Sequence, residues 1–311
     1  MATIRLFSHT DLDGYGCNIV MKALVSQARV ITTNINYEEN NEIIKNYILS
    51  GEYKDYRCTF ITDISVNEEV AELIDKTKDL KLVLLDHHPT AEWLNKYDWA
   101  NVCVNNCFEK TSGTELLFNF LVSSDGCVED WNYFREIHDF VKQVKRYDTW
   151  LWKEKYNDDT PKKLNDLFYI LGYDKFYSSL KENNFNVKFL IHDYSYLLEN
   201  QQKKIDKYIE KKNKEIIGCP IRDYNVGVVF ANQYQSELGN RLSELNPQYD
   251  LIAMIGENTI SYRAIKDNAN CGEFAKLFGG GGHPKASGSE INEEQKNKII
   301  DLLFDKGLEE N

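Results

Sequence analysis

The sequence predicts an α/β protein in two parts: a parallel sheet flanked by helices, then a smaller mixed α/β domain. Strand-like and helix-like segments alternate along the first third of the chain, an order typical of parallel sheets with helices on both faces. Residues 58–63 and 81–86 are nearly continuous apolar runs, as expected for strands buried on both faces. A length of 311 residues exceeds the usual size of one domain, so we expect two hydrophobic cores.

The first domain is expected to begin with a strand at 4–8, a polar turn and a helix at 17–28. The alternation then continues with a strand at 29–35, a helix at 38–51, a strand at 58–63, a helix at 67–78 and a strand at 81–86. From about residue 111 the apolar pattern is helical, and it remains so to about residue 200. We therefore expect this domain to cover residues 1–196.

A lysine-rich, helix-favouring segment at 197–217 is expected to form a helical linker. A second alternating region then covers 218–311. Its predicted elements are strands at 224–231, 250–256 and 259–265, helices at 236–245 and 271–278, and a glycine-rich loop at 279–288. This second domain is smaller than the first.

The composition limits the partners of the protein. A net charge of −12 makes a long nucleic acid duplex a poor candidate, because duplex-binding proteins usually present a basic surface. Short phosphorylated substrates are compatible with this net charge, since bound metal cations can supply positive charge locally. No run of about 18 apolar residues exists, so we expect no membrane partner.

The N-terminus lacks the features of a secretory signal, and we expect a cytoplasmic protein. Seven scattered cysteines, an odd number, predict reduced thiols. Cys103 and Cys107 form the one close pair, and no second ligand pair with zinc-site spacing accompanies it.

Histidine and aspartate side chains follow three of the predicted strands. In open α/β sheets ligands bind beyond the carboxyl ends of the strands, so side chains there should converge on one edge. The residues expected at this edge are His9, Asp11, Asp13, Asp63, Asp86, His87 and His88. Carboxylates combined with imidazoles suit Mn²⁺, Mg²⁺ or similar cations.

Three aspartates also have a purely structural interpretation. Asp13 and Asp63 follow strands and precede helices, where an aspartate often serves as the N-cap. Asp148 follows a helical segment and precedes two tryptophans, as a turn residue beside core aromatics would. By contrast, two adjacent histidines at the end of an apolar run, His87 and His88, seldom have a packing role.

The second domain carries the segment GGGGHPKASG at 279–288. Successive glycines allow unusual backbone angles and close approach of a ligand, while His283 and Lys285 can face an anion. The segment does not have the residue order of a P-loop. An anion-binding loop and a plain connection between helix and strand are both compatible with it.

Taken in order, H-x-D-x-D-G at 9–14, TD at 62–63, DHH at 86–88 and GGGGH at 279–283 resemble the DHH phosphoesterase superfamily. More narrowly, six segments resemble the nanoRNase B type of bacterial oligoribonuclease: FSHTDLDGYGC, ITDISVNEE, RYDTWLW, KKLNDLF, SELGNRL and GGGGHPKASG. The resemblance covers nearly the whole chain. It implies a metal-binding DHH domain, a DHH-associated substrate-binding domain and an active site in the cleft between them.

The resemblance also implies residue roles. His9 and Asp11 would bind one metal ion. Asp13, His87 and Asp148 would bind another, and Asp63 would bridge the two. His88 would contact the scissile phosphate, Asp86 would orient the neighbouring imidazole, and Ser112 and Thr114 would support the site. The residues that would hold substrate phosphates are Arg263, Gly280, Gly281, Gly282 and His283.

The implied activity is the exonucleolytic hydrolysis of short oligoribonucleotides, from the 5′ end, to nucleoside monophosphates. Two divalent ions would activate a water, with Mn²⁺ preferred and Mg²⁺ or Co²⁺ as substitutes. The implied partners are short RNA or DNA oligonucleotides and nucleotides, and a homodimer is allowed. Alternatives within the enzyme class are a cyclic dinucleotide phosphodiesterase, a 3′-phosphoadenosine 5′-phosphate phosphatase and a RecJ-like single-strand DNA exonuclease. A nucleotide-sensing module without catalysis is the alternative outside it.

Overall fold

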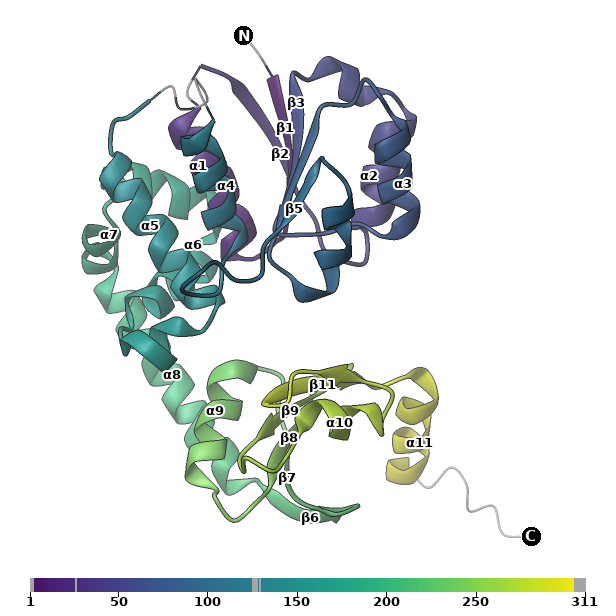
Figure 1. Ribbon diagram of the computed structural model, residues 1–311. Coiled ribbons are helices and arrows are strands. Elements are labelled where there is room, and N and C mark those ends of the chain that lie inside the picture. Colours follow the sequence, from purple (N-terminus) through teal and green to yellow (C-terminus); the bar gives the residue numbers. More distant parts are fainter. Residues whose placement is uncertain (1–2, 26, 125–127, 129, 305–311) are drawn as a thin grey trace. The chain divides into compact units, whose positions relative to one another are not determined.

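The computed structural model describes residues 3–25, 27–124, 128 and 130–304. By its internal contacts the chain divides into two compact units, Met1–Leu198 and Glu199–Asn311. Helix α8 (Ser195–Lys214) spans the division between them in the sequence. Each unit has a sheet of its own, shown in Figure 1, and a core of its own.

The first unit is built on a parallel sheet that has five strands among the described residues, in the order β2-β1-β3-β4-β5. The strands are β1 (Thr3–Ser8), β2 (Arg29–Asn34), β3 (Cys58–Thr62), β4 (Leu82–Asp86) and β5 (Ala100–Val102). The predicted parallel sheet is therefore confirmed. The three-residue strand β5 is too short to leave a pattern in the sequence, and it was not predicted.

Helices cover both faces of this sheet (Figure 1). One core packs beneath α1 (Leu12–Leu24), α4 (Gly113–Ser123), α5 (Phe134–Asp148), α6 (Thr160–Glu182) and α7 (Val187–Asp193). The other lies under α2 (Asn40–Leu49), α3 (Glu68–Lys76) and the 3₁₀ helices η1 (Glu52–Asp55) and η2 (Pro89–Lys96). The central strands are buried from both sides, which explains why their sequences are continuously apolar.

The second unit contains a mixed sheet with the strand order β10-β11-β9-β8-β7-β6 in the described part of the chain. Its elements are β6 (Ile217–Ile221), β7 (Tyr224–Phe230), α9 (Gln235–Leu245), β8 (Leu251–Ile255), β9 (Thr259–Ala264), α10 (Cys271–Lys276), β10 (Gly281–Gly282), β11 (Ala286–Glu290) and α11 (Glu293–Phe304). Only β7 and β8 pair in parallel within it. Separate apolar clusters lie against α9 and α10, so this unit too has its own cores.

Two further expectations can be compared with the described residues. Within them, no helix has the length and apolar character needed to cross a membrane. Cys17, Cys103, Cys107, Cys219 and Cys271 carry free thiols, whereas Cys127 lies outside the described residues.

Candidate metal centre

The carboxyl ends of three parallel strands place the predicted side chains in one region of the first unit. His9 follows β1 directly, Asp63 follows β3, and Asp86 is the last residue of β4. The chain order β1, β3, β4 is also the spatial order at the centre of the sheet, so these ends are neighbours. Asp148, the last residue of α5, reaches the same region from a distant part of the sequence.

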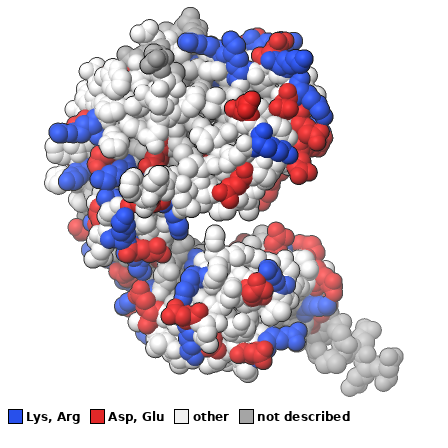
Figure 2. Space-filling model, in the orientation of Figure 1, with Lys and Arg blue, Asp and Glu red and all other residues white. Residues whose placement is uncertain are grey.

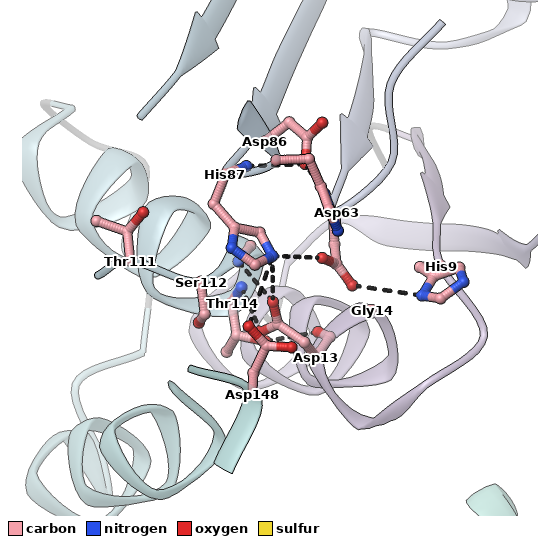
Figure 3. A network of polar contacts seen from close by, with 12 residues as sticks. His9, Asp13, Gly14, Asp63, Asp86, His87, Thr111, Ser112, Thr114 and Asp148 are labelled. Atoms are coloured by element: carbon pink, nitrogen blue, oxygen red, sulfur yellow. Dashed lines mark hydrogen bonds and ion pairs between the residues drawn. The ribbon is translucent and has the colours of Figure 1, made fainter. Parts of the chain in front are cut away.

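His87 lies at the centre of the cluster (Figure 3). Its Nε2 atom is 3.1 Å from Asp63 Oδ1 and 3.6 Å from Asp13 Oδ2. The same nitrogen is 3.6 Å from Asp148 Oδ2. One imidazole nitrogen therefore faces three carboxylates from three different elements, an arrangement that coordination of a common cation would explain.

A second group adjoins the first through Asp63. His9 Nδ1 is 3.1 Å from Asp11 Oδ2 and 4.0 Å from Asp63 Oδ2, while the other Asp63 oxygen faces His87. Among the described residues, two sets of three therefore have their nitrogen or oxygen atoms within 4.8 Å of one another: His9, Asp11 and Asp63, and Asp13, His87 and Asp148. Asp63 has one oxygen directed to each set.

The turn after β1 separates Asp11 from Asp13. Asp11 is the N-cap of α1 and accepts a hydrogen bond from the Gly14 amide at 3.0 Å, so the helix begins at Leu12, earlier than predicted. Asp13 is therefore not the cap and is buried in the first turn. A Cβ at Gly14 would lie 2.2 Å from the His9 carbonyl oxygen, so this close turn requires glycine.

The beginning of α4 holds Asp13 in place. The Asp13 carboxylate accepts hydrogen bonds from the amides of Gly113 at 2.6 Å and Thr114 at 2.9 Å, and the helix N-terminus favours its negative charge. The Thr114 hydroxyl also donates to the Asp13 carbonyl, at 2.6 Å. Ser112 supports this arrangement indirectly, because it is the N-cap of α4.

Asp63 has an unusual backbone for a non-glycine residue, with φ at 57°. Residues in this left-handed region cluster at functional sites, because their strain must be compensated by the surrounding structure. Asp63 does not cap α3, whose N-cap is Asn67, so the capping alternative is wrong. A Cβ at Gly113 would lie 2.5 Å from the Asp63 Cβ, which shows how closely the start of α4 packs against it.

The electrostatics of the cluster favour a bound cation. Burial, followed by the charges of Asp13 and Asp11, raises the pKa of Asp63 well above its ordinary value. Loss of hydration and the same two charges also raise the pKa of Asp148. Asp63 Oδ2 is buried and has no hydrogen-bond partner among the described residues. A divalent cation would satisfy this oxygen and offset the repulsion between the carboxylates, so the residues fit a metal.

The two histidines differ in their electrostatic surroundings. Burial lowers the pKa of His87, which keeps its ring neutral and able to coordinate. Burial has the same tendency at His88, but a 2.7 Å hydrogen bond to Asp86 and the charge of that carboxylate outweigh it and raise the pKa of His88. Asp86 also accepts from the His87 amide at 2.8 Å, so this fully buried carboxylate orients both residues.

Tyr37 is a neighbour of the site that was not predicted. Its hydroxyl is 3.2 Å from the ring nitrogens of His88, and its ring lies 5.2 Å from that of His9 between centroids. Tyr37 follows β2, so its place after a strand was a usable signal. A single tyrosine in a polar loop nevertheless has no motif to distinguish it.

A partly exposed ion-pair network links the two segments that flank the cluster. Glu109, in the loop before α4, accepts hydrogen bonds from Lys155, at 2.6 Å, and from Tyr156 in the π-helical turn η3 (Trp152–Tyr156). The bond from Lys155, then that from Tyr156, lowers the pKa of Glu109 to about 2. Lys145 approaches the same carboxylate at 3.4 Å.

We expect Glu109→Gln to lower the melting temperature at neutral pH by about 2–4 °C, a value typical of a loss near 1 kcal/mol. Because the folded-state pKa lies below the ordinary 4.5, the stabilisation is full above that pH and is lost as the pH falls from 4.5 towards 2. Urea unfolding at pH 7 and pH 3 should therefore show a smaller difference from wild type at pH 3. Glu72→Gln, at an exposed ion pair with Lys76, is the control. Equal losses at both pH values would contradict this assignment.

The residues predicted to bind phosphate all lie in the second unit. Arg263 is on β9, paired with Ala286 of β11, and its guanidinium donates to the Tyr262 carbonyl at 2.9 Å. Burial lowers its pKa, and no carboxylate pairs with it in the part of the chain that the structure describes. His283 is exposed in a tight turn with Ala286, whereas Lys285 pairs with Asp267 at 2.8 Å.

Two of the predicted glycines have a packing reason of their own. A Cβ at Gly280 would lie 2.1 Å from the Gly288 carbonyl oxygen, and one at Gly282 would lie 2.8 Å from the Ser287 Cα. Gly282 also has φ at 136°. By contrast, no atom lies within 4 Å of a Cβ built at Gly281. Within the segment, Gly281 and Gly282 form the two-residue strand β10, and β11 begins at Ala286.

Known proteins resemble the chain in sequence and in fold. It is 37% identical over 299 residues to the oligoribonuclease NrnB of Bacillus subtilis, covering 93% of this chain and 73% of that protein. A 3′,5′-cyclic-nucleotide phosphodiesterase of Helicobacter pylori is 23% identical over 338 residues, covering 94% of each chain. The crystal structure of exonuclease RecJ bound to manganese has a TM-score of 0.55 at 12% identity, over 96% of this chain and 88% of that one. No protein-family model matches.

The RecJ likeness shows a common fold alone, because the sequences are so different. The similarity to NrnB shows more than a common fold, because 37% of the aligned residues are identical and the alignment covers 93% of this chain. The expected resemblance is thereby confirmed: the chain belongs to the family of the oligoribonuclease NrnB, and is a phosphodiesterase of the DHH superfamily.

Proposed function

We propose that the protein hydrolyses short oligoribonucleotides to nucleoside monophosphates, using two divalent ions held by the metal cluster of its first unit. The observation that carries the proposal is Asp63, whose two oxygens face the two sets of ligands. A carboxylate so placed can be shared by a pair of cations. The oligoribonuclease name of the relative from Bacillus subtilis supports RNA as the substrate.

His9, Asp11 and Asp63 would hold the first ion, and Asp13, His87 and Asp148, together with Asp63, would hold the second. These oxygen and nitrogen ligands suit Mn²⁺, with Mg²⁺ or Co²⁺ as substitutes. The manganese in the RecJ structure of the same fold supports this choice. When bound, such a pair lowers the pKa of a coordinated water and stabilises charge on phosphate oxygens.

The chain's own residues position the substrate. His88 projects from the same strand end as His87, and the hydrogen bond and charge of Asp86 raise its pKa against the effect of burial, which favours a ring that can donate to an oxygen of the scissile phosphate. Asp86 also fixes the orientation of the ring, and the Tyr37 hydroxyl contacts its nitrogens. In the second unit, Arg263 and His283 bind further substrate phosphates, together with the backbone of Gly280, Gly281 and Gly282.

The charge of the protein supports a short substrate. The chain has a net charge of −12, and the face seen in Figure 2 mixes lysines and arginines with acidic side chains. A long strand or duplex gains most of its affinity from an unbroken basic surface, whereas a few phosphates can be held by two cations and one or two cationic side chains. The free thiols suit a reducing compartment, so we propose a cytoplasmic enzyme.

The test is hydrolysis of end-labelled RNA of graded length with Mn²⁺, where products are followed over time. We expect the shortest RNAs to be cut fastest, with mononucleotides released one by one from the 5′ end. A 3′,5′-cyclic nucleotide and 3′-phosphoadenosine 5′-phosphate are included, because one relative is named a cyclic-nucleotide phosphodiesterase. Faster turnover of either compound, or of long single strands, would replace short RNA as the proposed substrate.

Arg263 tests the role of the second unit. We expect Arg263→Ala to raise KM for dinucleotides about 10- to 100-fold, because a charge-assisted phosphate contact is lost, while a generic phosphodiester without further phosphates is still cut slowly. Arg241→Ala is the matched control, since Arg241 is in the same unit and its guanidinium already pairs with Glu244 at 2.7 Å. An unchanged KM for Arg263→Ala would remove this residue from the proposed site.

A further inference from the structure

A small cavity opens beside the metal cluster within the first unit. Its volume is about 130 Å³, and its lining includes Asp11, Asp13 and Asp148 together with Asn165 and Tyr169 of α6. Asn165 and Tyr169 are four residues apart on one helix, so they lie on the same face of α6. Asn165 belongs to the segment KKLNDLF, to which the metal cluster gives no role.

Asn165 is a polar residue that is almost completely enclosed by the protein. It is only 6% exposed, and its carboxamide has no hydrogen-bond partner among the residues that the structure describes. Its amide atoms are not among the fully enclosed side-chain atoms that lack a partner, so they reach the space of the cavity. Since the side chain lines the cavity, a ligand bound there can supply the missing partner.

Tyr169 complements this amide with an aromatic surface. Its side chain is 63% exposed although it lines the cavity, so a large part of the ring is free to contact a ligand. Leu12, Val144 and a second aromatic residue, Tyr147, complete the lining. The lining therefore combines an exposed aromatic ring, apolar side chains and one amide. A planar heterocycle can stack on such a ring and form hydrogen bonds with such an amide.

The negative charge of the three aspartates in the lining determines which part of a nucleotide enters the cavity. Three carboxylates repel a phosphate wherever a cation does not stand between them, so a phosphate belongs at the cations and a neutral group in the cavity. The volume is also below the roughly 300–1,000 Å³ of pockets that enclose a whole drug-sized ligand. It suits one nucleobase and not a dinucleotide.

We propose that this cavity binds the nucleobase next to the scissile phosphate, with Tyr169 stacking on the base and Asn165 hydrogen-bonding its edge. The proposal rests on the proposed function, because a base next to the scissile phosphate presupposes a nucleotide substrate. It makes the enzyme dependent on the base at one position, and it makes Tyr169 and Asn165 specificity-determining residues in addition to the metal ligands.

The test is equilibrium binding, by calorimetry, to the Mn²⁺-loaded full chain. Its two ligands are adenosine 5′-monophosphate and ribose 5-phosphate, which share the phosphate and the sugar and differ in the base. We expect wild type to bind the nucleotide at least about tenfold more tightly, as base stacking on one aromatic side chain predicts. Tyr169→Ala should bring this ratio close to one, while Tyr169→Phe should retain most of it because the ring remains.

Two further variants sharpen the result. Asn165→Ala should weaken nucleotide binding by about three- to tenfold through loss of its hydrogen bonds. Tyr196→Ala is the control, because Tyr196 is 74% exposed in the same unit and does not line the cavity, and it should keep the wild-type ratio. Equal affinity of wild type for both ligands, or a wild-type ratio in Tyr169→Ala, overturns the base site. Neither measurement needs turnover, so they are independent of the RNA hydrolysis that tests the proposed function.

Discussion

Asp63→Asn is expected to lower metal-dependent hydrolysis by at least about 10³-fold, because several kcal/mol of transition-state stabilisation depend on both cations. Asp63 is the carboxylate that faces both sets of ligands, so in the proposed centre its loss would weaken the binding of both ions. The substitution keeps the size of the side chain, and asparagine tolerates the left-handed backbone at φ 57° as well as aspartate does. The measurement is the hydrolysis of short RNA at saturating Mn²⁺.

The fold should survive this change. The substitution removes one of several crowded carboxylates, so we expect the metal-free variant to melt no lower than metal-free wild type. Asp75→Asn is the control, at an exposed position on α3, and should retain wild-type activity. Comparable turnover by Asp63→Asn and wild type would show that Asp63 is not shared by two cations.

Removal and return of the metal should change stability as well as activity. A ligand that binds only the folded state stabilises it by about 2.7 kcal/mol at a concentration 100 times its Kd, so Mn²⁺ should raise the melting temperature of the chelated protein by about 5–10 °C. The physical source is the cluster itself: Asp63 Oδ2 has no hydrogen-bond partner among the described residues, and burial with neighbouring charges raises the pKa values of Asp63 and Asp148. Chelation should also abolish hydrolysis.

The stoichiometry is measured in the same titration. We expect two Mn²⁺ ions per chain, and a much smaller rise in melting temperature for Asp63→Asn. Arg263→Ala should keep the full rise, since this residue lies in the other unit and takes no part in the cluster. A melting temperature that does not respond to saturating Mn²⁺ would be incompatible with the proposed centre.

The predictable part of this protein follows from local patterns. The apolar runs that end at Asp63 and Asp86 could be read as buried parallel strands, and the carboxyl ends of such strands meet at one edge. For this reason the convergence of His9, Asp63 and His87 could be expected before any contact was known. The short strand β5 and the early start of α1 were not predicted, because a periodic pattern cannot be recognised in three residues or in one helical turn.

Other parts of the site arise only from packing. Asp13 is held by amides about 100 residues away, and His87 meets Asp148 at the far end of α5. Spacing alone did not distinguish Asp148 from an ordinary turn residue, and only the family resemblance suggested it. Asn165 lies in the segment KKLNDLF, which contributed to the family resemblance, but no role was predicted for it or for Tyr169, since one amide and one ring on a helix are common.

By itself, the amino-acid sequence determined the class of fold, the family and the strand ends that carry acids and imidazoles, because these depend on residues close together in the chain. The tertiary structure alone decided which atoms face one another: the two oxygens of Asp63 directed to different ligand sets, the start of α4 around Asp13, and the cavity beside α6. The physical reason is that these contacts are made when helices pack on the sheet, and packing joins residues whose separation in the sequence carries no pattern.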